Sequence, residues 1–138
     1  MKQAVFFIDR FTYKNLANYD TLKQLIRKEV SELPPEYGII HPVGNQTAWR
    51  ILNETVRHMG APVEVAQPLF GEFVAKGVIV RSLAGELATM YDRAVIFDTP
   101  VGYHRGGAKY FVFYCVKRGV DVKYYLILEN NYILLGPR

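Results

Sequence analysis

The sequence predicts a three-layer α/β fold, in which a mainly parallel sheet of about five strands carries helices on both faces. Short apolar runs alternate with segments whose apolar residues recur at helical spacing, and the connections between them are short. The run Ala94 to Phe97 is apolar at every position, as in a strand buried on both faces. A length of 138 residues suits one domain, so residues 1–138 are interpreted as a single unit.

The first strand is expected at Ala4 to Ile8, and residues 11–19 read as a polar-aromatic loop. Asp20 or Thr21 is expected to cap the first helix, which Pro34-Pro35 stops. The apolar face of that helix consists of Leu22, Leu25, Ile26, Val30 and Leu33. Tyr37 to Ile40 is expected to be the second strand.

A second strand-to-helix loop, His41 to Thr47, leads into a helix that Gly60 is expected to end. Its apolar face would hold Ala48, Ile51, Leu52, Thr55, Val56 and Met59. Pro62 to Ala66 is expected to return as the third strand, and residues 67–80 show no regular pattern. Ser82 is expected to cap a helix that leads into the fourth strand.

After the fourth strand, a loop is expected to hold Gly102, Arg105, Gly106 and Gly107. The helix that follows has Ala108, Phe111, Val112, Cys115 and Val116 at helical spacing, and Gly119 closes it. A fifth strand is expected from Val120 to Ile127. After the turn signal Asn130-Asn131, Tyr132 to Leu135 would add a short antiparallel edge strand.

Composition limits the function classes. The single cysteine excludes an internal disulfide and a cysteine-based metal cluster, and it fits a reducing, cytoplasmic setting. No metal is expected, because His41 and His58 have no second ligand at metal spacing. No apolar run approaches the roughly 20 residues that span a bilayer, and no signal peptide is visible. The net charge of +4 is weak support for a nucleic-acid partner, because the basic residues are spread along the chain.

The glycines before the last helix indicate an anion site. Where a helix begins after a parallel strand, free N–H groups and the helix dipole can hold an anion. A second strand-to-helix loop would line the same cleft. The predicted contacts are Asp9, Arg10, Gly44, Asn45, Gln46, Thr47, Arg81, Asp98, Gly102, Arg105, Gly106, Gly107 and Ala108.

Each of these contacts also has a purely structural interpretation. The stretch from Gly44 to Thr47 would equally serve as a polar helix cap, and Asp9 and Arg10 as a surface ion pair. Glu86 reads as an exposed helix carboxylate rather than a catalytic one, and Cys115 as inert core.

The last helix is apolar on a second face as well, which carries Tyr110, Phe113 and Tyr114. A helix that is apolar all round is buried on both sides. In a single layer outside a sheet, the second side must meet another element or another subunit. The sequence therefore predicts a homodimer through these three aromatic residues.

Several of these stretches resemble motifs of one family. They are Ile8-Asp9-Arg10 after the first strand, Asn18-Tyr19-Asp20, the loop from Gly44 to Trp49, Arg81-Ser82, and Gly106-Gly107-Ala108. Together they resemble the SLOG superfamily of Rossmann-like domains, named after the DNA-uptake protein DprA (Smf) and the lonely-guy cytokinin enzymes. The likeness is nearest to its small stand-alone YspA-type branch. The resemblance implies a Rossmann-like fold and a nucleotide-derived ligand of unknown identity. Asp98, at the end of the fourth strand, is the candidate acceptor for a ribose hydroxyl of such a ligand.

Three functions follow from this resemblance. The first is non-catalytic binding or sensing of a nucleotide-derived small molecule. The second is a phosphoribohydrolase like the lonely-guy enzymes, but Lys109-Tyr110-Phe111 stands where those enzymes carry a glutamate, and Arg81 is followed by Gly85 in place of their Arg-x-x-x-Met element. The third is a single-stranded nucleic-acid or protein interaction module that uses Tyr103-His104-Arg105 and the last helix.

Overall fold

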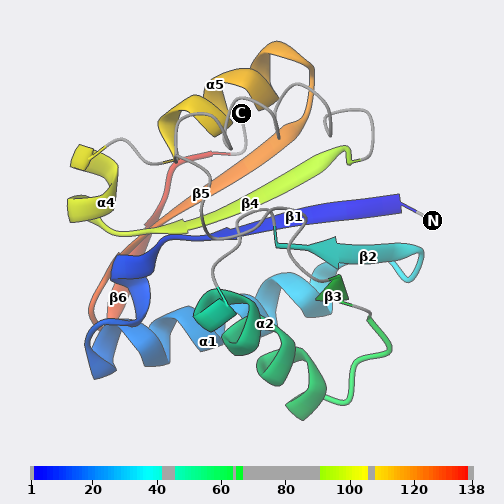
Figure 1. Ribbon diagram of the computed structural model, residues 1–138, viewed down its shortest axis with the longest axis horizontal. Coiled ribbons are helices and arrows are strands. Elements are labelled where there is room, and N and C mark those ends of the chain that lie inside the picture. The colour runs from blue at the N-terminus through cyan, green and yellow to red at the C-terminus, as the bar shows by residue number, and fades with distance from the viewer. Residues whose placement is uncertain (1, 42–45, 64, 67–90, 106–107, 137–138) are drawn as a thin grey trace.

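The computed structural model describes residues 2–41, 46–63, 65–66, 91–105 and 108–136 (Figure 1). One six-stranded sheet runs through this part of the chain in the order β3-β2-β1-β4-β5-β6. Its strands are β1 (Lys2–Ile8), β2 (Tyr37–Ile40), β3 (Val65–Ala66), β4 (Arg93–Asp98), β5 (Asp121–Leu128) and β6 (Asn131–Leu134). The first five pair in parallel, and β6 pairs antiparallel with β5. The predicted parallel core with an antiparallel edge strand is confirmed.

Side-chain alternation along β1 divides the core into two layers. Ala4, Phe6 and Ile8 pack with α1 (Leu16–Glu32) and α2 (Gln46–His58) on one side of the sheet. Val5 and Phe7 point the other way and pack with α5 (Lys109–Lys117). Figure 1 shows α5 on one side of the sheet and α1 and α2 on the other. Because successive strand side chains point to opposite faces, an all-apolar strand needs such cover on both faces, and the three-layer prediction is confirmed.

The start of α1 differs from the prediction. The polar-aromatic segment holds a 3-10 helix, η1 (Arg10–Tyr13), and α1 begins directly after it, with Asn15 as its N-cap. The Asn15 side chain accepts a hydrogen bond from Asn18 N at 2.8 Å. The prediction of Asp20 or Thr21 as the cap was wrong, because the first turn of α1 carries no apolar stripe that would mark it in the sequence. Its first residue, Leu16, is 75% exposed.

The glycine segment after β4 also differs. A loop was predicted from the end of β4 through Arg105, but the structure has a short helix there, α4 (Pro100–Arg105). Thr99 Oγ1 accepts a hydrogen bond from Gly102 N at 3.2 Å, and Pro100 follows the threonine directly. A threonine cap followed by proline is a common helix start, and Gly102 alone does not prevent a helix of this length.

The remaining predictions concern the helix ends, a helix outside the described residues, and membrane spans. Gly60 (φ +68°) and Gly119 (φ +78°) follow α2 and α5 in left-handed conformations, as expected for helix ends. The helix predicted to start at Ser82 lies outside the described residues. Among the described helices, none is both long and apolar enough to cross a membrane.

Candidate functional site

The strand order determines where a site would form. The arrangement β3-β2-β1-β4-β5 is that of doubly wound sheets, in which the connections diverge on either side of β1 and β4. Ligands of such folds bind beyond the carboxyl ends of the two strands at this switch point. Here Asp9 directly follows β1 and Asp98 ends β4. Both are sequence candidates, and the sheet brings them together.

The two aspartates form a buried acid pair. Asp9 is 6% exposed and Asp98 is fully buried, and their carboxyl groups lie close enough for the charge of one to act on the other. Asp98 Oδ1 accepts from Thr99 N at 2.8 Å, and its Oδ2 accepts from the Tyr124 hydroxyl. Asp9 Oδ2 accepts from Phe11 N at 3.0 Å. Backbone and tyrosine donors therefore fix both carboxyl groups.

This environment changes the protonation of Asp98. Burial raises the pKa of Asp98 to about 6, the Tyr124 hydrogen bond opposes this rise, and the negative charge of Asp9 adds to it. Burial and the hydrogen bond to Asp98 also raise the pKa of Tyr124, so its hydroxyl stays a donor. A neighbouring negative charge disfavours the charged form of Asp98 and so favours its protonated form. We name Asp9 and Asp98 the acid pair.

The backbone of α4 closes over the acid pair. A Cβ atom added to Gly102 would lie 2.0 Å from Asp98 Oδ1 and 2.6 Å from Asp9 Oδ2. Only a residue without a side chain allows this approach. Gly102 was predicted to offer its N–H to an anion; in the structure that N–H donates to Thr99 and the residue packs on two carboxyl groups.

Cationic side chains gather around one ring next to the acid pair. Arg10 Cζ, Lys14 Nζ and Arg105 Cζ lie 5.1, 4.6 and 5.3 Å from the centroid of the Phe11 ring. All three cationic residues are exposed, and Phe11 is half-buried. Among the residues that the structure describes, none of the three forms an ion pair with a carboxylate. We call these four residues the Phe11 cluster.

A groove adjoins the Phe11 cluster at the carboxyl edge of the sheet. It has a volume of about 490 Å³ and lies between the start of α1, the start of α4 and the end of β5. Its lining residues are Phe11, Lys14, Asn15, Asn18, Thr99, Pro100, Val101, Ile127, Leu128 and Glu129. The volume is in the range of small-molecule sites, roughly 300–1,000 Å³.

Of the remaining sequence candidates that the structure describes, none is among the lining residues of this groove. Ala108 is buried beside α5, and Thr47 is exposed on the first turn of α2, where Gln46 is the first residue. The candidates that fall outside the described residues are Gly44, Asn45, Arg81, Gly106 and Gly107. The predicted convergence of the two glycine loops therefore stays a prediction.

Phe11, Lys14, Thr99 and Tyr124 of this region were not among the candidates predicted from the sequence. Lys14 had a signal in its spacing of four from Arg10, and Thr99 had one in the Thr-Pro pair. Tyr124 had no local signal, because it reaches Asp98 only through the pairing of β4 with β5. Within the described part of the chain, no group of three or more histidine, cysteine, aspartate or glutamate side chains could hold a metal ion.

No protein-family model matches the chain, and no curated protein matches it. The resemblance to the SLOG superfamily therefore stays an expectation, and the functional argument depends on the geometry at the carboxyl edge.

Proposed function

We propose that the protein binds a phosphate-bearing, nucleotide-derived small molecule at the carboxyl edge of its sheet and does not act on it chemically. The observation that carries this proposal is the Phe11 cluster, where three exposed cationic side chains surround one ring. It lies at the switch point, where folds with this strand order bind their ligands.

Electrostatics supports an anionic ligand. The three cationic groups lie within roughly a Debye length of one another, which is about 10 Å at 0.1 M salt. Such a group of like charges repels itself unless an anion joins it. A phosphate suits this position, because arginine can bind it through two parallel N–H bonds and lysine as a point charge.

The groove beside the cluster supports a ligand larger than phosphate alone. Its wall combines the Phe11 ring with the apolar side chains of Val101, Ile127 and Leu128. A flat, largely apolar group such as a nucleobase can cover such a surface while its phosphate reaches the cationic side chains. Lys14 belongs to both the groove and the cluster, so it connects the two parts.

The acid pair supports a binding role without catalysis. A general acid or base must reach the reacting atom within hydrogen-bond distance or through one water molecule. Asp9 and Asp98 are buried, hydrogen-bonded and covered by Gly102. Their role in the proposal is to hold the ends of β1 and β4 together beneath the site.

A thermal-shift experiment tests this function. AMP, ADP and NAD at about 1 mM should raise the melting temperature, because a ligand that binds only the folded state stabilises it by about 2.7 kcal/mol at a concentration 100 times its Kd. The double variant Arg10→Gln/Arg105→Gln should lose the shift. The matched control Arg118→Gln removes one exposed charge beyond the end of α5 and should keep it. An equal shift in the double variant would refute the proposed site.

A second candidate function, binding of single-stranded nucleic acid, has its own observation. Lys109 Nζ lies 4.6 Å from the centroid of the Tyr103 ring, so a second cation-aromatic pair lies next to α4. Successive bases stack on aromatic rings while cationic groups follow the backbone. Fluorescence anisotropy with a short oligonucleotide at two salt concentrations separates the candidates, because strand binding weakens steeply with salt.

We also propose that two copies associate in the cytoplasm through the outer face of α5. Phe113 is 61% exposed there, while the side chains of Tyr110 and Tyr114 lie outside the described part of the structure. Light scattering at two protein concentrations, with Phe113→Asp as the comparison, tests this association.

A further inference from the structure

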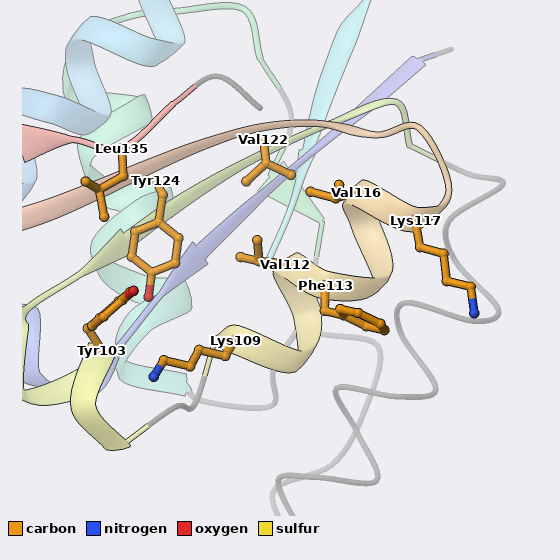
Figure 2. Close-up of a pocket in the computed structure, with 9 residues that line it drawn as sticks. All are labelled: Tyr103, Lys109, Val112, Phe113, Val116, Lys117, Val122, Tyr124 and Leu135. Atoms are coloured by element: carbon orange, nitrogen blue, oxygen red, sulfur yellow. The ribbon is translucent and has the colours of Figure 1, made fainter.

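A second hollow lies on the α5 face of the sheet, between α5 and β5 (Figure 2). Its volume is about 370 Å³. Val112 and Val116 of α5 form one wall, and Val122 and Tyr124 of β5 form the other. Leu135, just after β6, lies beside Tyr124 in Figure 2. We call this hollow the α5 pocket.

Helix periodicity explains why the α5 pocket stays open. Phe111 and Cys115 point into the core and are fully buried, which fixes the rotation of α5. Val112 and Val116 share the neighbouring stripe, and Val116 is 45% exposed. Because Phe111 and Cys115 provide the fully buried contacts of α5, the neighbouring stripe of Val112 and Val116 is only partly covered where it faces β5.

A lysine lies at each end of the wall that α5 contributes to the pocket. Lys109 is at the start of α5 and Lys117 at its end, about 12 Å apart along the axis at 1.5 Å per residue. Both line the α5 pocket, and no acidic residue is among its described lining. Within the described ranges, neither lysine forms an ion pair with a carboxylate. A ligand that complements this surface has an apolar body and one negatively charged end.

We infer that the α5 pocket binds a free aliphatic carboxylate of the fatty-acid type. The chain lies against the valine stripe and the Tyr124 ring, and the carboxylate meets Lys109. That ammonium group already lies 4.6 Å from the Tyr103 ring centroid, at the mouth of the pocket. This site is separate from the Phe11 cluster. Its ligand is mostly apolar with one charge, whereas the ligand proposed for the Phe11 cluster bears phosphate.

Charge and volume favour this occupant over the alternatives. The association of two copies proposed above uses Phe113, which also lines this hollow. A second copy that filled the hollow itself would bring its own Lys109 and Lys117 against these two, and like charges at close range repel. A docked amphipathic helix needs a row of anchor sites over several turns. The α5 pocket is instead a single hollow near the small end of the range for small-molecule sites.

Calorimetric titration with octanoate, decanoate and dodecanoate, each below its micelle concentration, tests the inference. Affinity should rise about fourfold with each added methylene, which corresponds to about 0.8 kcal/mol. Acetate should not bind measurably. The neutral 1-decanol should bind about two- to fivefold more weakly than decanoate, because it lacks the ion pair.

Three variants locate the site. Val116→Trp fills the pocket from an exposed position and should weaken decanoate binding on the order of tenfold, with the fold intact by circular dichroism. Lys109→Gln should weaken decanoate about two- to fivefold and leave decanol unchanged. The matched control Arg118→Gln removes one charge next to Lys117 and should bind as the unmodified protein does.

Three results would overturn the inference. One is no dependence of affinity on chain length. Another is equal decanoate binding by the unmodified protein and Val116→Trp. The third is a different partner for the pocket. In that case decanoate would bind neither protein, and Val116→Trp would abolish either the association of two copies or co-sedimentation with anionic vesicles.

Discussion

Replacing Gly102 by alanine should destabilise this protein, although the same substitution inside a helix usually stabilises the helix. In a helix interior, alanine is favoured over glycine by about 1 kcal/mol. Gly102 lies inside α4 and does not have a positive φ, so propensity alone predicts a gain. The contacts of the added methyl group predict the reverse.

The magnitude follows from what the methyl group would meet. It would lie 2.0 Å from Asp98 Oδ1 and 2.6 Å from Asp9 Oδ2, far inside van der Waals contact. Neither carboxyl group can easily move, because backbone N–H groups hold both and the Tyr124 hydroxyl also donates to Asp98. Overpacking of this kind costs about 1–3 kcal/mol and sometimes more. An approach of 2.0 Å belongs at the upper end of that range, so after the propensity gain of about 1 kcal/mol we expect a net loss of about 2 kcal/mol.

Urea denaturation measures this loss as a change in the free energy of unfolding. Gly38→Ala is the matched control, because its added Cβ would meet the flexible amide end of Gln3 at 2.9 Å and that side chain can move aside. In an Asp98→Ala background the nearest clashing atom is gone, so Gly102→Ala should cost much less there. Equal or greater stability of Gly102→Ala would show that the α4 backbone does not close on the acid pair.

Three further predictions concern buried polar groups. Burial raises the pKa of Asp98 from 3.8 to about 6, so the protonated side chain stabilises the folded state by up to roughly 3 kcal/mol. This contribution is fully present below about pH 4 and is lost as the pH rises past 6. Asp98→Asn should flatten that part of the pH profile in urea titrations, and an unchanged slope would contradict the assignment. Tyr125→Phe removes the hydroxyl that donates to the buried Glu29 and should cost about 1–3 kcal/mol, whereas the control Tyr132→Phe at an exposed ring should cost little. Cys115 is fully buried with its pKa raised to about 11, so a thiol reagent should modify it only as fast as the chain opens; rapid labelling of the folded protein would place it at the surface.

The sheet and the main helices were predictable because their signals are local. Strands such as β1 and β4 are short apolar runs, and α2 shows its buried face at helical spacing. The β6 edge strand follows from the Asn130-Asn131 turn signal. Where a segment lacks an apolar stripe, prediction failed: the exposed first turn of α1 and the short α4 were both interpreted as loops.

The candidate site was predictable only in part. Asp9, Arg10, Asp98 and Arg105 were selected individually because they follow strands or precede a glycine loop. The sequence did not indicate that the two aspartates would share a buried contact, or that both arginines would approach one phenylalanine ring.

By itself, then, the sequence determined the elements, their alternation and the three-layer architecture, because hydrophobic periodicity is encoded between near neighbours in the chain. Only the tertiary structure decided which polar residues meet. Parallel pairing of β1 with β4 places Asp9 beside Asp98, and the return of α4 over both strand ends brings Gly102 onto the acid pair and Arg105 to Phe11. The physical reason is that strand order and helix rotation depend on the packing of the whole core.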